Sequence, residues 1–292
     1  MEIVFHLGMH CTDADLLIRS ILQNRARLAE DGICVPGPLR YRELIGKAST
    51  TLRGAAAPEM TEETLLVAID DGRDTERIIL SNDNFLCRSD AALGPDGLYP
   101  KIEKSAWLRK SVPSHEVSFA LAIRNPATFL PDLLSGAAGR RPPQSVLEGG
   151  ICLDDMRWVR VVEALANANP GCPILVWCHE DTPFIWSELL RELTGYDATQ
   201  PLDGALDMAE AIMTPEGFKR LTDFKEARNI ETESRWRRTL SSFLETYAER
   251  EKVETEIDLP GWTEETVDRL TELYEEDVAV IANLPGVTMI TP

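Results

Sequence analysis

The residues most able to do chemistry lie where a short apolar segment, residues 3–7, runs into the sequence GMHCTDAD at residues 8–15. A strand, a glycine turn, polar residues and then a helical pattern are typical of an α/β junction. Anions bind at such junctions because free backbone N–H groups and the helix dipole point out of them. The segment therefore predicts an anion-binding loop near the start of the chain.

The roles of Cys11 and of the two histidines, His6 and His10, are the next question. Cys11 at a helix N-terminus could be a reactive thiolate, but Asp13 and Asp15 oppose a second negative charge there, which favours a small residue with no chemical role. His6, His10 and Cys11 match the spacing of no common metal site, so no metal is expected. His6 is interpreted as a hydrogen-bonded structural histidine, whereas His10 in the loop is the better functional candidate.

Three more polar turns follow apolar runs further along the chain. They are Ser81–Asn84, Arg124–Pro126 and His179–Asp181, after the runs 77–80, 117–123 and 173–178. Ligands in parallel α/β sheets sit beyond the carboxyl ends of the strands. The four turns therefore predict one shared cleft at one edge of a sheet.

The elements that must position these turns alternate between strands and helices. Strands are expected at 3–7, 33–35, 77–80, 117–123 and 173–178, with a short extended piece at 287–290. Helices are expected at about 13–30, 61–70, 99–111, 126–135, 153–167 and 184–193, and later at 206–213, 215–228, 234–250 and 263–282. Residues 37–60 are expected to be irregular and 136–150 a mobile loop. This alternation predicts a largely parallel sheet with helices on both faces.

Composition narrows the class of protein. The 292 residues allow one large α/β domain or two small ones, and a net charge of −19 argues against a nucleic-acid partner. No apolar run approaches a membrane span, and no leader is evident, so we expect a cytoplasmic protein with no membrane partner. The six cysteines form no CxxC pair and suit reduced, mostly buried thiols. The acidic stretches 245–258 and 264–277 are interpreted as solvated helical faces.

The four turns, in this order, resemble the sulfotransferase family. In bacterial members that resemble this chain, strand one runs into a pattern like G-M-H-K-T-G-T-T, where residues 8–15 read GMHCTDAD. The sequence of residues 24–36, NRARLAEDGICVP, is also similar to the family. Ser81–Asn84 matches a strand that ends S-x-E-N, Arg124 a strand that ends in Arg, and residues 177–181 an E-D-type turn. Residues 273–287 resemble the family's C-terminal helix and tail.

This resemblance implies an α/β, P-loop NTPase-like fold of three layers, α/β/α, with a mainly parallel sheet. It implies a single domain, residues 1–292, of which about 200–292 form a mainly helical C-terminal extension. The family transfers a sulfuryl group from 3′-phosphoadenosine 5′-phosphosulfate (PAPS) to a hydroxyl acceptor, here a small molecule or carbohydrate. The resemblance assigns acid/base chemistry to Asp83 or His10. It places the donor against Gly8, Met9, His10, Cys11, Thr12, Arg124 and Asp132.

The sequence departs from the family at the groups that hold the donor. Cys11 replaces the family's lysine, and a thiol cannot supply its positive charge. Asp13 and Asp15 stand where glycine and hydroxyl residues wrap the phosphate, and Asp132 stands where a serine meets the 3′-phosphate. Two like charges about 4 Å apart cost on the order of 4 kcal/mol at an effective dielectric near 20, about three decades in binding. We therefore expect only weak binding of PAPS or of its product, 3′-phosphoadenosine 5′-phosphate (PAP).

Several assignments stay open from the sequence alone. Arg124 is either a phosphate ligand or an ion-pair partner of Asp132, two turns along the next helix. Asp83 is either a base or part of a turn cap with Ser81 and Asn84. The chain is either a PAPS-dependent sulfotransferase or a catalytically inactive protein of that fold that acts as a binding or scaffold module. The turn at 179–181 is interpreted as a helix cap, and the indoles of Trp158, Trp177 and Trp186 as core side chains.

Overall fold

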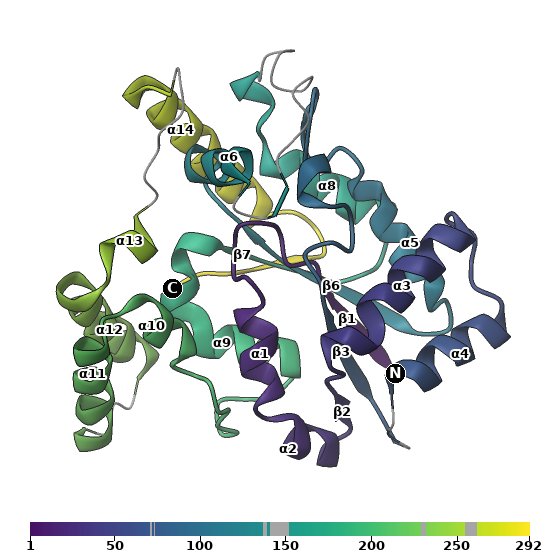
Figure 1. Cartoon of the computed structure of the whole chain (residues 1–292), viewed down its shortest axis with the longest axis horizontal. Helices are drawn as coiled ribbons and strands as arrows, with labels where there is room; N and C mark the ends of the chain where they lie inside the picture. The colour runs from purple at the N-terminus through teal and green to yellow at the C-terminus, as the bar shows by residue number, and fades with distance from the viewer. Residues whose placement is uncertain (71, 73, 137–138, 141–151, 229–231, 255–261) are drawn as a thin grey trace.

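A parallel sheet with helices on both faces forms the body of the computed structural model (Figure 1). The structure describes residues 1–292 except 71, 73, 137–138, 141–151, 229–231 and 255–261. The larger sheet has the strand order β2-β3-β1-β6-β7-β8, and every pairing in it is parallel. The strands are β1 (Glu2–His6), β2 (Ile33–Cys34), β3 (Arg77–Ser81), β6 (Glu116–Ile123), β7 (Ile174–Cys178) and β8 (Val287–Ile290). The predicted α/β fold of three layers is confirmed.

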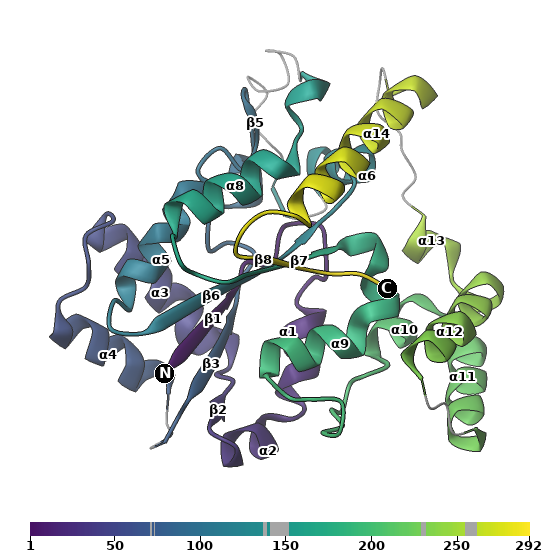
Figure 2. The same cartoon turned by 180° about the vertical axis from the view of Figure 1, so that it is seen from behind.

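Strand β1 lies between β3 and β6 and divides the core in two. Successive side chains of a strand point to opposite faces, so Ile3 and Phe5 pack into one apolar core and Val4 packs into the other. The first core lies under α3 (Pro38–Leu52), α5 (Ser105–Ser111), α6 (Pro126–Ser135), α8 (Trp158–Ala168) and α14 (Glu264–Ile281). The second lies under α1 (Leu16–Leu22), α2 (Arg25–Glu30) and α9 (Thr182–Thr194), on the other face in both views (Figures 1 and 2).

The later helices form two groups. The first group has a small apolar core of its own and adjoins α9, away from the sheet (Figure 2). It comprises α10 (Asp207–Ile212), α11 (Pro215–Ala227), α12 (Glu233–Tyr247) and α13 (Arg250–Val253). Helix α14 returns to the sheet and packs against α6 and α8. Its Asp277 is fully buried and accepts hydrogen bonds from Arg157 Nε and the Trp158 backbone N–H. The prediction that the acidic stretch 264–277 is a solvated face is therefore wrong for Asp277.

Several predicted segments differ from the structure. The expected helices at 99–111 and 153–167 each contain a 3-10 turn, and the α-helices α5 and α8 start only at Ser105 and Trp158. The expected helix at 13–30 is two helices, α1 and α2, because Asn24 between them is buried and exchanges hydrogen bonds with the Asp203 backbone. The segment 37–60 is not irregular, since α3 fills much of it. Pro38 starts this helix, and Tyr41 and Ile45, one turn apart, carry its buried face. Two apolar residues four apart are a helical pattern, which predicts a helix in this segment.

Smaller elements complete the chain. They are α4 (Glu59–Ile69) and the antiparallel pair β4 (Leu93–Gly94) and β5 (Gly97–Leu98), which was not predicted. Most of the predicted loop at 136–150 lies outside the described residues. In the part of the chain that the structure describes, no helix is both long and apolar enough to cross a membrane.

The prediction of buried tryptophans is confirmed, whereas that of mostly buried cysteines is not. Trp158, Trp177 and Trp186 are buried, as predicted. None of the six cysteines, all of which the structure describes, forms a disulfide. The prediction that most are buried is wrong, since only Cys178 is buried and Cys152 is exposed.

Candidate functional site

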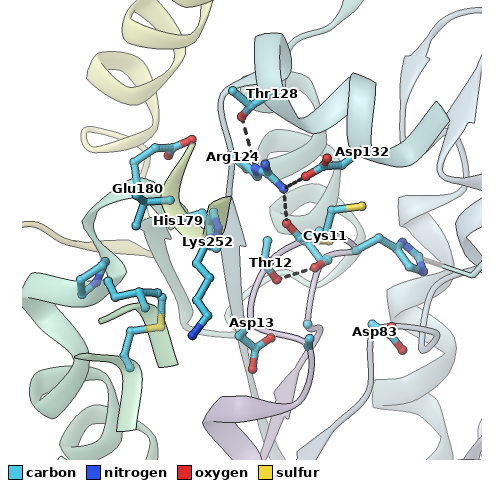
Figure 3. A pocket seen from close by; sticks show the side chains of 18 of the residues that line it. Cys11, Thr12, Asp13, Asp83, Arg124, Thr128, Asp132, His179, Glu180 and Lys252 are labelled. Carbon is cyan, nitrogen blue, oxygen red and sulfur yellow. Dashed lines mark hydrogen bonds and ion pairs between the residues drawn. The ribbon is translucent and has the colours of Figure 1, made fainter. Parts of the chain in front are cut away.

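The four predicted turns meet at one cavity of about 880 Å³ beyond the carboxyl ends of β1, β3, β6 and β7. Its wall includes residues 8–15, Ser81 and Asp83, Arg124 and Asn125, and His179 and Glu180. The prediction of a single cleft is therefore confirmed. All the residues that the resemblance assigned to donor or catalysis line this cavity (Figure 3).

One wall of the cavity was not predicted. Met208 and Ile212 on α10 and residues 251–254 on and after α13 also line it. Figure 3 shows the Lys252 side chain extending into the cavity from this wall. Its Nζ forms an ion pair with Glu249 Oε2 at 2.7 Å. Nothing in the sequence near Lys252 distinguishes it from the other charged residues of the helical extension.

The loop at 8–15 has a strained backbone. Gly8, Cys11, Ala14 and Asp15 have φ angles of 49°, 58°, 47° and 68°. Glycine suits the first position, because a Cβ there would lie 3.2 Å from the Asp83 backbone nitrogen. The left-handed region costs about 1–2 kcal/mol for each of the three other residues. Contacts from outside the loop must therefore hold it in place.

The two aspartates of the loop, Asp13 and Asp15, have different hydrogen-bond partners. Asp13 Oδ2 accepts the Leu17 backbone N–H of α1 at 3.0 Å, so this carboxylate caps the start of the helix. Asp15 makes no side-chain cap. Its carboxylate instead takes a two-point ion pair from Arg42, at 2.9 and 2.6 Å. These hydrogen bonds from Arg42 lower the pKa of Asp15.

The Arg124 side chain contacts both the loop at 8–15 and α6 (Figure 3). Its Nη1 donates to the Cys11 carbonyl oxygen at 2.6 Å and forms an ion pair with Asp132 Oδ2 at 2.7 Å. Its Nε donates to Thr128 Oγ1 at 3.2 Å. The side chain is buried, so the ion-pair interpretation of Arg124 and Asp132 is confirmed. The guanidinium fastens the loop at 8–15 to α6.

His10 is held by one buried hydroxyl. The Tyr99 hydroxyl accepts the His10 backbone N–H and lies 2.9 Å from His10 Nδ1. It satisfies both contacts by donating its proton to Nδ1, which leaves the ring proton on Nε2. Burial raises the pKa of Tyr99 and lowers that of His10, although Asp83 and Asn84 oppose the second shift. In this tautomer His10 is neutral and carries its proton on Nε2.

The remaining predicted residues also have defined partners. Asn84 Nδ2 donates to Asp83 Oδ1 at 2.5 Å, while the cap of this turn is Asn82 Oδ1, which accepts the Asn84 N–H. His6 Nδ1 contacts Ser81 Oγ at 2.9 Å, but its buried Nε2 has no hydrogen-bond partner among the described residues, so His6 is only partly satisfied.

The turn at 179–181 directly precedes α9 and places Asp181 at the N-cap position, as predicted, although the Asp181 side chain makes no capping hydrogen bond. Glu180 accepts hydrogen bonds from the Asn125 backbone N–H at 2.8 Å and the Tyr274 hydroxyl at 2.9 Å. The Glu180 side chain therefore joins β6, β7 and α14 at the cavity. Burial, and then the charge of Arg124, lowers the pKa of His179 to about 4.

The cavity wall carries many more carboxylates than cationic side chains. Seven carboxylates line it, against the two cationic side chains of Arg124 and Lys252. The carboxylates are Asp13, Asp15, Asp83, Asp132, Glu180, Glu251 and Glu254. His10 and His179 add no charge near neutral pH, because burial lowers the pKa of each.

The residues present do not fit a sulfonucleotide donor. Arg124 already binds a carboxylate, the Leu17 N–H of α1 is capped, and the loop at 8–15 has no cationic residue. Among the residues that the structure describes, no group of three or more His, Cys, Asp or Glu could hold a metal ion. No protein-family model and no curated protein matches the chain.

Proposed function

We propose that this chain is a sulfotransferase-like protein that binds a small molecule in the 880 Å³ cavity and does not transfer a sulfuryl group. The observation that carries the proposal is the 2.7 Å ion pair between Arg124 and Asp132. The resemblance assigns this arginine to the 3′-phosphate of the donor. A phosphate would have to displace Asp132 or approach within a few ångströms of its charge.

The loop at 8–15 supports the same conclusion. Asp13 uses the Leu17 N–H, which is the kind of group that an anion at a helix N-terminus needs. A donor phosphate about 4 Å from the Asp13 carboxylate would lose about 4 kcal/mol at an effective dielectric near 20. That loss equals about three decades in dissociation constant.

Calorimetric titration with PAP tests the proposal. We expect no binding of PAP up to millimolar concentration, and a micromolar dissociation constant would overturn the proposal. The triple variant Cys11→Lys, Asp13→Gly, Asp132→Ser should gain affinity for PAP, because it restores the cation and removes two carboxylates. The matched control is Asp268→Asn, an exposed carboxylate of α14 that does not line the cavity, which should leave PAP binding unchanged.

A second candidate function is sulfuryl transfer from PAPS to a hydroxyl of a carbohydrate or small metabolite. The observation that favours it is Lys252, a cation that α13 brings to the cavity in place of the missing loop lysine. Release of PAP from PAPS by the wild type, lost in Lys252→Met, would favour this candidate over the first. If neither the wild type nor Lys252→Met releases PAP from PAPS, the second candidate is refuted and the binding function stands.

A further inference from the structure

A second cavity, of about 670 Å³, lies between α9 and the paired helices α11 and α12. Its walls come from α9, from the segment 198–205, and from the end of α11 and the start of α12. Small-molecule sites typically enclose about 300–1,000 Å³. Among the residues that the structure describes, none lines both this cavity and the candidate site. The second cavity is therefore a separate candidate for a ligand.

Two cationic side chains of this cavity contact aromatic rings rather than carboxylates. Lys225 Nζ lies 5.2 Å from the centre of the Trp236 ring, and the guanidinium carbon of Arg228 lies 4.8 Å from that of the Phe224 ring. Neither cation forms an ion pair with any residue that the structure describes. A cation–π contact fixes the position of a cation and leaves its positive charge without a counter-ion. Both charges are therefore available to an anion.

The spacing of the two cations lets one anionic group reach both. Lys225 and Arg228 are three residues apart at the end of α11, and this spacing places side chains on one face of a helix, with Cβ atoms about 5–6 Å apart. Loss of hydration lowers the pKa of Lys225, although the charge of Glu233 opposes this shift. An anion beside the ammonium group would offset the lost hydration.

The other charges of the wall leave a positive surplus. Arg191 Nη2 and Glu233 Oε1 form an ion pair at 3.1 Å, which joins α9 to α12. Glu226 is the remaining carboxylate among the described lining residues, against the two cations of α11. The candidate site has the opposite balance, with seven carboxylates and two cations. An anion is therefore better accommodated in the second cavity than in the first.

The second cavity also offers apolar surface. Leu190 of α9 is fully buried and lines the cavity together with Pro201 and Leu202. The indole of Trp236 adds a flat ring on the side of α12. A ligand that carries only a charge would leave this apolar surface in contact with water, whereas an apolar group of the ligand would cover it.

We propose that the second cavity binds a small organic carboxylate with an apolar body. Its carboxylate pairs with Lys225 and Arg228, and its apolar body packs against Leu190, Leu202 and the Trp236 indole. This site is additional to the binding function proposed for the first cavity and does not depend on it.

Calorimetric titration with three related compounds tests the proposal. 3-Phenylpropanoate carries both the charge and the ring, 3-phenylpropanamide carries the ring alone, and propanoate carries the charge alone. The titrations use about 0.1 M salt, because a Debye length of about 10 Å screens the distant carboxylates of this acidic chain. We expect phenylpropanoate to bind about ten times more tightly than either of the other two. Equal affinity for the amide or for propanoate, or no binding of phenylpropanoate at millimolar concentration, would overturn the proposal.

A pair of lysine variants on α11 identifies the cation. Lys225→Met keeps the length of the side chain and removes its charge, so it should weaken phenylpropanoate binding about fivefold and leave binding of the amide unchanged. The matched control is Lys219→Met, an exposed lysine of the same helix that does not line this cavity, which should bind phenylpropanoate like the wild type. Equal weakening in both variants would show an effect of net charge alone and would overturn the proposal. Circular dichroism checks that each variant folds.

A variant of the first cavity separates the two sites. Lys252 lines the first cavity and not the second, so Lys252→Met should leave phenylpropanoate binding unchanged. Weaker binding in Lys252→Met than in Lys225→Met would place the anion in the first cavity and overturn this proposal. Micromolar binding of PAP would overturn only the function proposed for the first cavity, whatever phenylpropanoate does.

Discussion

The ion pair between Arg42 and Asp15 should hold the loop at 8–15 in its strained conformation. Both terminal nitrogens of Arg42 bind the Asp15 carboxylate, at 2.9 and 2.6 Å, and Nε donates to the Ser81 carbonyl oxygen at 2.9 Å. Arg42 thereby fastens the start of α1 to the end of β3. Replacing it by glutamine removes the charge and two of the three contacts.

The exposed fractions of the two side chains, 25% for Arg42 and 42% for Asp15, set the expected magnitude. Exposed pairs are worth about 0.2–1 kcal/mol, and hydrogen bonds to charged groups about 1.5–3 kcal/mol. A two-point pair at intermediate exposure should fall between these ranges. We expect a coupling free energy of about 1.5 kcal/mol from the double-mutant cycle of Arg42→Gln and Asp15→Asn.

Urea unfolding at pH 7 of the wild type, both single variants and the double variant gives this coupling energy. Hydrogen exchange of the amides at 16–20 should also quicken in Arg42→Gln, because the start of α1 loses its anchor. The matched control is the pair of Arg220 and Glu216, which is exposed on both sides and should give a coupling of at most about 0.5 kcal/mol. A coupling below about 0.3 kcal/mol for Arg42 and Asp15, with unchanged exchange, would refute the reasoning.

The same pair predicts a pH dependence. Hydrogen bonds from Arg42 lower the pKa of Asp15 below its ordinary value of 3.8. The unfolded chain therefore takes up this proton first as the pH falls, and the stabilisation present above pH 3.8 disappears below it. Arg42→Gln should lose less stability than the wild type between pH 5 and pH 3 (about the range in which this carboxylate titrates). Parallel curves for the two proteins would contradict this prediction.

Two other predictions concern the same cavity. The pKa of His179 is about 4 in the folded protein, against an ordinary value of 6.5, so the unfolded chain takes up this proton first as the pH falls. The free energy of unfolding should therefore decrease as the pH falls from 6.5 to 4, by at most about 3 kcal/mol. His179→Gln should remove this part of the loss in urea unfolding, and an unchanged pH profile would contradict it. Ala14 is exposed and has a φ of 47°, so Ala14→Gly should stabilise the protein by about 1 kcal/mol. Thermal unfolding checks this, with Ala166→Gly in α8 as a control that should lower stability by about 1 kcal/mol.

Much of the fold could be predicted because its strands and helices are local patterns. Apolar runs such as 117–123 and 173–178 predicted strands, and their alternation with helices predicted a parallel sheet. The errors arose where a tertiary contact decides local structure. Asn24 ends α1 because it binds the backbone of Asp203, a partner that no local pattern can indicate.

Some features of the candidate site could be predicted from local sequence patterns, and others depend on tertiary contacts. The positions of the four turns follow from the sheet, so the cavity could be predicted from the strand ends. The ion pair of Arg124 and Asp132 could also be predicted, because both residues lie on adjacent segments. The contribution of Lys252 and the pairing of Arg42 with Asp15 could not, since each depends on how a separate helix packs.

One of the two outer strands of the sheet, β8, comes from residues 287–290, whereas β1 in its middle comes from residues 2–6. A ribosome therefore makes β1, β3, β6 and β7 long before the strand that covers the free edge of β7. Until α14 and β8 emerge, that edge and the core side chains beneath α14 stay open to other chains. Production at high synthesis rates should favour aggregation of unfinished chains, and slower synthesis or bound chaperones should raise the yield of folded protein.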